Sequence, residues 1–338
     1  MEKVTFNRII NNYRVLIDDY HKYNVSKFWI YQNKLKKVLE INEDDLVSFR
    51  SNILSKTLDP GNSYLIDEET ESKKILETFD NLVKKDGDLG CFSETGIGEP
   101  YTTKIHGIDM NRSSIMNGFF YKKIKKYVEN GSSIMEIGGG YGGLSSLFVQ
   151  NYNINYYMYD LPEAILMQTY FLSKVVPNKK LCLVDNYSDC KDELDSMHLL
   201  TPNYIKDLNN SSIDLFMNFF SMQEMDIKTV NLYLSEVGRV IKDNGIVVLA
   251  NRLKKVSNLS DYNIPDSFDV VEFSSLDVHI FPKLTFFLIL KKKTQKDNKL
   301  SAKKILSQFN PNSKISRLFG RIKLYLKAVL RKFFHIKL

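Results

Sequence analysis

The sequence predicts a doubly wound α/β fold with a mostly parallel, seven-stranded sheet, an N-terminal helical cap and a basic C-terminal helical tail. From residue 133 onward, short apolar runs alternate with helical patterns, which is typical of parallel strands joined by crossover helices. A glycine-rich turn separates the first of these strands from the first of these helices. The last two runs have no helix between them, and we expect them to form an antiparallel hairpin at the end of the sheet.

Length and composition are those of a folded protein with a sizeable core. The chain has 338 residues, of which 43% are hydrophobic and 26% are charged. This excludes a disordered or collagen-like chain and suggests about two domains. The segment from Leu284 to Leu290, which is apolar except for Thr285, is far shorter than the roughly 20 residues that span a bilayer. No secretory signal is visible at the start, and the three cysteines lack C-x-x-C spacing. We therefore expect a cytoplasmic protein without a disulfide framework or zinc site.

Residues 1–99 are predicted to form the helical cap, and residues 100–292 the sheet domain. Apolar side chains recur at helical spacing near residues 6–20, 75–83 and 115–128. The polar stretch from Asp86 to Met110 is predicted to be a loop.

The expected elements of the sheet domain follow in order. A helix is predicted from about Gly142, a second between Pro162 and Pro177, and a third near residues 230–241, followed by Gly245. The third strand is ambiguous, because both residues 181–184 and residues 198–200 fit. The other predicted strands are Ile134–Ile137, Ile154–Tyr159, Ile213–Phe219, Ile246–Ala250, Val270–Phe273 and Leu284–Leu290.

The glycine-rich turn, residues 138–143, predicts a nucleotide-type ligand. Its letters satisfy the dinucleotide fingerprint G-x-G-x-x-G, which is a weak signal in isolation. Glu136 precedes the turn, and a carboxylate there suits an ammonium group better than a pyrophosphate. Asp160 ends the next strand, where an acid can accept hydrogen bonds from both ribose hydroxyls of a nucleotide cofactor, NAD included.

Three segments, in order, resemble the bacterial sugar O-methyltransferase family of class I S-adenosylmethionine-dependent methyltransferases. They are residues 136–143 (EIGGGYGG), 159–163 (YDLPE) and 218–225 (NFFSMQEM), and the likeness covers about residues 95–290. The resemblance implies a Rossmann-like fold, S-adenosyl-L-methionine as cofactor, and methyl transfer to a sugar hydroxyl in a surface glycan such as capsule or lipopolysaccharide.

The candidate cofactor-binding residues lie at or just after the carboxyl ends of predicted strands. For the adenine side, Asp185 is slightly favoured over the segment from His198 to Asn203. Asp160 has an ordinary alternative role as a cap of the helix that begins at Pro162. The candidates are Glu136, Gly138, Gly140, Tyr141, Gly142, Asp160, Leu161, Asp185, Asn218 and Ser221.

Three residues are candidates for taking the proton of the acceptor hydroxyl. Glu224 follows the fourth strand, where class I O-methyltransferases often place substrate-contacting groups, although it could instead bracket the helix near Asp226. His106 precedes the glycine turn and His279 lies between the last two strands; a lone histidine is more often a surface or core residue. No metal-ligand cluster is evident.

Two other functions remain open. The glycine fingerprint and Asp160 also suit an NAD-dependent sugar oxidoreductase, and the fold could serve as a non-catalytic scaffold. The oligomeric state, the particular sugar and the hydroxyl that is methylated are not determined by the sequence.

The positive charge is concentrated in the C-terminal tail, residues 293–338. Residues 291–338 hold 15 Lys and Arg and one acid, whereas the preceding 290 residues hold 32 basic and 39 acidic side chains. A nucleic-acid enzyme would more often carry its basic charge around its cleft, so we expect no nucleic-acid partner. Bases such as Arg317 and Arg321 oppose apolar residues such as Phe319 and Ile322 at near-helical spacing. We expect a tail that docks on the inner face of a membrane or on an acidic protein.

Overall fold

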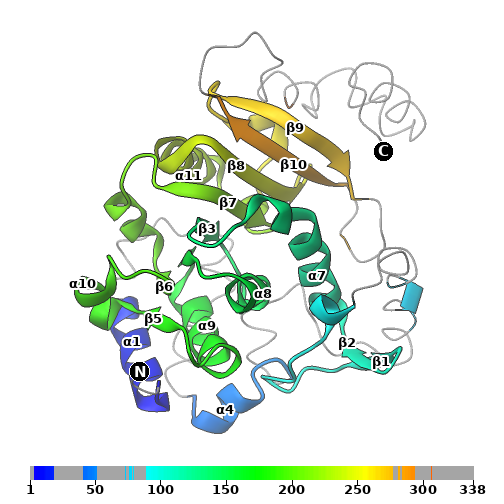
Figure 1. Ribbon diagram of the computed structural model, residues 1–338, viewed down its shortest axis with the longest axis vertical. Helices are drawn as coiled ribbons and strands as arrows, with labels where there is room; N and C mark the ends of the chain where they lie inside the picture. The colour runs from blue at the N-terminus through cyan, green and yellow to red at the C-terminus, as the bar shows by residue number, and fades with distance from the viewer. Residues whose placement is uncertain are drawn as a thin grey trace. The chain divides into compact units, whose positions relative to one another are not determined.

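The computed structural model describes residues 4–18, 41–51, 89–276 and 284–293, with isolated positions at 73, 76, 77, 79, 281 and 306. Described residues up to Ile205 form one compact unit, and those from Lys206 onward form a second (Figure 1). The tail lies almost wholly outside the described residues, so its helix stays a prediction, as do the domain boundaries at residues 99 and 292.

The first unit contains four parallel strands in the order β5 (Lys180–Cys182), β6 (Ser196–Leu200), β4 (Asn155–Tyr159) and β3 (Ser133–Ile137). Both segments that competed for the third strand are strands. β6 pairs directly with β4, and the three-residue β5 lies on the outer side of β6. Residues of β3 and β6 are almost entirely buried, as expected for a parallel sheet covered on both faces.

The second unit contains four strands in the order β7 (Ile213–Phe219), β8 (Ile241–Arg252), β10 (Thr285–Lys292) and β9 (Phe268–Ser275). β8 runs parallel to β7, and β10 is antiparallel to both β8 and β9. The predicted terminal hairpin is therefore confirmed. β8 begins earlier than predicted, so Gly245 lies within this strand rather than directly after the helix.

The mostly parallel α/β sheet with its antiparallel C-terminal hairpin matches the class I methyltransferase fold. The two units hold eight such strands, one more than predicted. The additional strand arises because both segments that competed for the third strand, now β5 and β6, form strands.

The helices begin and end where local sequence signals place them. α9 (Pro162–Val175) has proline in its first turn, and Asp226 caps α11 (Ile227–Val240) by accepting from the N–H groups of Lys228 and Thr229. Asn111 and Ser114 form a reciprocal capping box at the start of α7 (Arg112–Ile124). The remaining longer helices are α1 (Phe6–Asp18), which packs on α9, and α8 (Gly143–Asn151), which packs on α7.

The segment predicted as a loop, Asp86 to Met110, contains regular structure in its described part. A 3₁₀ turn, η2 (Gly90–Phe92), is followed by a hairpin of β1 (Thr103–Ile105) and β2 (Ile108–Met110). Two residues join these strands, and both have left-handed backbone angles, with φ of 49° at His106 and 80° at Gly107. Such a two-residue turn matches the twist of a hairpin, but three-residue strands carry too little periodicity to be predicted.

A disulfide joins Cys182 to Cys190, contrary to the expectation from the sequence. Their Cα atoms are 5.9 Å apart, and both residues are buried. The pair closes the segment between β5 and the short helix α10 (Tyr187–Cys190). Among the described residues, no helix combines the length and the apolar character that a membrane span requires.

Candidate functional site

The glycine turn joins β3 to α8 through left-handed backbone. The φ angles are 74° at Gly138, 59° at Gly140 and 96° at Gly142, values that side chains other than glycine rarely adopt. A Cβ at Gly140 would meet nothing within 4 Å, whereas one at Gly139 would approach the Glu136 carboxylate to 3.0 Å. The turn therefore packs closely on one side and leaves open space beside Gly140.

Asp160 lies at the carboxyl end of β4, and hydrogen bonds hold its carboxylate against the glycine turn. Its Oδ1 accepts from the N–H of Leu161 at 2.8 Å, and the backbone amides of Gly139 and Gly140 also donate to this carboxylate. Burial raises the pKa of Asp160 to about 7, although these hydrogen bonds oppose the rise. The N-cap of α9 is Leu161, without a side-chain cap. Asp160 is therefore not the helix cap that the alternative interpretation required.

Gln168 is a site residue that the sequence analysis missed. Its Nε2 donates to the carbonyl oxygen of Gly140 at 2.8 Å and to Oδ2 of Asp160 at 3.0 Å. Its Oε1 is buried and has no hydrogen-bond partner in the described part of the chain. Gln168 therefore ties the turn to the acid while leaving an acceptor unused. The only sequence signal was its place two turns into the helix that follows Asp160.

Glu136, proposed to face an ammonium group, lies beneath the turn. The Tyr156 hydroxyl donates to its Oε2 at 2.6 Å, and the residue is only 2% exposed. Burial raises the pKa of Glu136 to about 7, with the charge of Asp160 adding to the rise and the Tyr156 hydrogen bond opposing it. One carboxylate oxygen is thus committed to Tyr156.

Glu163, in the first turn of α9, is a second residue that sequence reasoning did not single out. It is buried, and within the described residues neither carboxylate oxygen bonds to another residue. Burial and the neighbouring charge of Asp160 raise its pKa to about 7. Two buried carboxylates, Glu136 and Glu163, therefore lie near the partly buried carboxylate of Asp160.

The structure places the two adenine-side candidates differently. Asp185 follows the outer strand β5 and forms an ion pair with Arg8 of α1, with Nε and Oδ2 3.0 Å apart. The other candidate segment ends β6, next to β4. The carbonyl oxygen of Leu200 accepts from the N–H of Asp160 at 3.1 Å, and the buried Thr201 follows directly. The geometry therefore favours the segment after β6 over Asp185.

In the second unit, Asn218 and Ser221 shape the turn after β7. The Nδ2 of Asn218 donates to Oγ of Ser221 at 2.6 Å, and its Oδ1 accepts from Nδ2 of Asn251 at 3.1 Å. Gln223 continues this buried network, because its backbone N–H donates to Oδ1 of Asn251 at 3.1 Å. These amides fix the turn and give Asn218 a structural role that the sequence did not predict.

Glu224 follows this turn and forms an ion pair with Lys255. Asp226, not Glu224, caps α11, so the helix-bracketing alternative does not describe Glu224. Its side chain is 16% exposed.

Of the two candidate histidines, only His106 lies among the described residues. His106 is exposed in the β1–β2 turn, and its ring centroid lies 5.2 Å from that of Phe79. The left-handed backbone there gives His106 a structural role in the turn. His279 lies outside the described residues.

The residues of the first unit fit an adenosyl cofactor. Nε2 of Gln168 joins Gly140, which has open space beside it, to the Asp160 carboxylate through the hydrogen bonds above. Among the described residues, no group of three or more His, Cys, Asp or Glu side chains could hold a metal ion.

Comparisons with known proteins give distant structural likenesses. No family model matches the chain, and no curated protein matches it. A SAM-dependent methyltransferase from Aquifex aeolicus is 13% identical, with a TM-score of 0.34 over 51% of this chain and 88% of that one. One from Methanosarcina mazei is 16% identical, with a TM-score of 0.35 over 52% of this chain and 99% of that one.

A larger enzyme is similar over more of this chain. Phosphoethanolamine N-methyltransferase 1 of Haemonchus contortus, in complex with phosphoethanolamine and S-adenosylhomocysteine, is 12% identical. Its TM-score is 0.39 over 79% of this chain and 57% of that one. Likeness at these values does not identify an activity, so the fold rests on the strand order described above.

Proposed function

We propose that this protein binds S-adenosylmethionine at the glycine turn and transfers its methyl group to a sugar hydroxyl. One observation carries the cofactor proposal: Gln168 joins the carboxylate of Asp160 to the carbonyl oxygen of Gly140, beside open space. An acid fixed at this place can accept hydrogen bonds from both ribose hydroxyls.

The cofactor, when bound, supplies a methyl group already activated by a sulfonium. The protein must therefore chiefly hold the acceptor in line and exclude water. In the proposal, Asp160 accepts from the ribose, the glycine turn admits the cofactor, and Glu136 contributes negative charge near its ammonium group. When Asp160 and Glu136 are ionised, their negative charges suit a ligand that carries a sulfonium and an ammonium group.

The sugar acceptor is supported by the resemblance of the three sequence segments alone. This resemblance favours, as the methyl acceptor, a hydroxyl of a surface glycan such as capsule or lipopolysaccharide, or a hydroxyl of its precursor. Mass spectrometry of the glycan from cells with and without this protein tests this assignment. Loss of a methyl group from one sugar in the cells that lack the protein is the expected result; an unchanged glycan would contradict it.

Glu224 is proposed as the base that takes the hydroxyl proton. Its ion pair with Lys255 gives the carboxylate a fixed neighbour just after the turn that follows β7. Glu224→Gln keeps the shape and removes the proton acceptor, so turnover should fall about 10²–10⁴-fold while cofactor affinity stays near that of the native protein. Asp214→Asn, which removes the carboxylate of the ion pair with Lys242, is a matched control in the same unit. Full activity of Glu224→Gln would remove Glu224 from the mechanism.

A further inference from the structure

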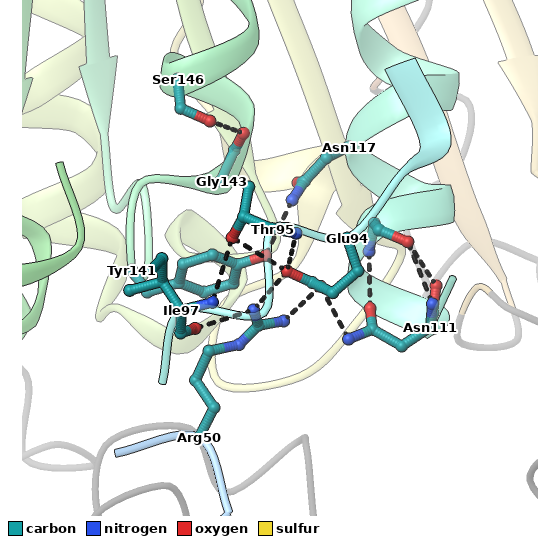
Figure 2. A network of polar contacts seen from close by, with 10 residues as sticks. Arg50, Glu94, Thr95, Ile97, Asn111, Asn117, Tyr141, Gly143 and Ser146 are labelled. Carbon is teal, nitrogen blue, oxygen red and sulfur yellow. Dashed lines mark hydrogen bonds and ion pairs between the residues drawn. The ribbon is translucent and has the colours of Figure 1, made fainter. Parts of the chain in front are cut away.

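Tyr141 lies inside the glycine turn, and its side chain packs against residues from outside the sheet. The guanidinium carbon of Arg50 stands 4.3 Å from the centre of the Tyr141 ring, and Nδ2 of Asn117 donates to its hydroxyl at 3.2 Å (Figure 2). The Phe171 ring meets it edge-on at 4.9 Å. The side chain that follows Gly140 is thus held between α7, α9 and the segment 42–50.

Arg50 is itself fixed by a buried, two-pronged ion pair. Its two terminal nitrogens lie 2.7 and 2.8 Å from the carboxylate oxygens of Glu94, and the two side chains are only 2% and 3% exposed. Nδ2 of Asn111 donates to the same carboxylate at 2.8 Å. Burial would raise the pKa of Glu94, but the hydrogen bond and charge of Arg50 hold it below its ordinary value. Both partners are therefore charged, and the planar guanidinium has one fixed orientation under the ring.

The start of α8 depends on the same packing. A Cβ at Gly143 would lie 2.3 Å from Nδ2 of Asn117 and 2.5 Å from the Tyr141 hydroxyl oxygen. The glycine turn is therefore held by contacts of Tyr141 with Arg50 and Asn117, and also by the hydrogen bond from Gln168 to Gly140. Figure 2 shows Arg50, Glu94 and Asn111 forming a continuous chain of polar contacts beside Tyr141.

A buried ion pair is a costly way to obtain stability alone, because apolar residues of similar size often serve as well. Here the ion pair with Glu94 holds Arg50 in one orientation against Tyr141, a residue of the glycine turn. We propose that Arg50, acting through Tyr141, is a positioning residue for the cofactor, so that docking of residues 42–50 and cofactor binding strengthen each other. This inference rests on the proposed function. Because such linkage is reciprocal, ligand binding must also stabilise the docked segment.

Calorimetry with S-adenosylhomocysteine tests the linkage on the full chain. Arg50→Lys keeps the charge and loses the two-pronged geometry, so its dissociation constant should rise about tenfold. Tyr141→Phe keeps the ring and should stay sensitive to Arg50→Lys, whereas in a Tyr141→Leu background the lysine substitution should have little further effect. The matched control is Glu193→Gln, which removes an exposed ion pair with Lys180 in the same unit and should bind like the native protein.

Hydrogen exchange of the native protein provides a second measurement, independent of how well the variants fold. S-adenosylhomocysteine should slow exchange in residues 42–50 and 89–98. An Arg50→Lys variant with native affinity, equal losses in the Tyr141→Phe and Tyr141→Leu backgrounds, or unchanged exchange in both segments would each overturn the linkage. Absence of any binding by the native protein would instead overturn the proposed function, and the linkage with it.

Discussion

Gln168 and Asp160 are joined by a hydrogen bond of 3.0 Å, and the same amide nitrogen of Gln168 reaches the carbonyl oxygen of Gly140. One side chain on α9 thus connects the acid that ends β4 with the turn that ends β3. Their mutual placement defines the shape of the candidate cofactor site.

Replacing Gln168 should weaken cofactor binding more than its distance from the reacting atoms would suggest. Gln168→Ala removes the bridge and leaves the Asp160 carboxylate with fewer donors, which should cost about 1–3 kcal/mol of binding free energy for S-adenosylhomocysteine. Gln150→Ala is a matched control, because Gln150 is an exposed glutamine on α8. Calorimetry that shows equal affinities for the two variants would contradict the role of Gln168.

A side chain at Gly140 should prevent the cofactor from binding. In Gly140→Val the branched side chain would enter the open space beside the turn and strain a backbone with φ of 59°, so binding should be abolished. Gly107→Val imposes similar strain at φ of 80°, also with nothing near the added Cβ, but in the β1–β2 turn. Gly107→Val should lose stability and keep its affinity. Equal ligand binding by both variants would show that the space beside Gly140 is not used.

The buried Glu163 should make folding stability depend on pH. Its pKa rises from 4.5 to about 7 on folding, so the folded protein binds this proton more tightly than the unfolded chain does. The resulting stability is fully present below about pH 4.5 and is lost as the pH rises through about 7.

Glu163→Gln stays neutral at every pH, and its unfolding free energy should therefore fall less over this interval, by on the order of 1–3 kcal/mol. The pKa values of Asp160 and Glu136 are also raised, so the unfolding free energy of the variant will still depend on pH. Urea unfolding at several pH values measures the difference, with exposed Glu193→Gln as control. Parallel pH curves for native protein and Glu163→Gln would disprove the prediction.

The tail, residues 293–338, is proposed to hold the enzyme at anionic membrane surfaces, where each nearby Lys or Arg contributes roughly 1 kcal/mol. A chain that ends at Lys293 keeps β10 complete and retains the ion pair between Lys293 and Asp269. Full-length protein should co-sediment with vesicles that contain anionic phospholipid, and the shortened chain should not. Equal sedimentation of the two at low salt would leave an acidic protein as the partner to seek.

Much of the fold could be predicted from the sequence, because the apolar period changes from helix to strand at each boundary. The glycine turn and Asp160 were recognisable because their spacing is local. The β1–β2 hairpin was not, since strands of three residues show almost no period, and the sequence did not show that residues 181–184 and 198–200 both contribute strands.

The side chains that hold the glycine turn in place were harder to predict, because their partners are distant from them in the sequence. Gln168 reaches Gly140 from α9, and Arg50 meets Glu94 across 44 residues of sequence. A single sequence contains no spacing that relates such pairs. The choice between Asp185 and the segment after β6 likewise depends on which strand pairs with β4, and the structure shows that β6 does.

Calorimetric titration of the native protein with S-adenosylmethionine, S-adenosylhomocysteine and NADH tests the central claim most directly. The account predicts binding of the first two, no binding of NADH, and an affinity for S-adenosylhomocysteine that falls by about 1–3 kcal/mol in Asp160→Ala. Tight binding of NADH without a response to either adenosyl ligand would contradict it and favour an oxidoreductase.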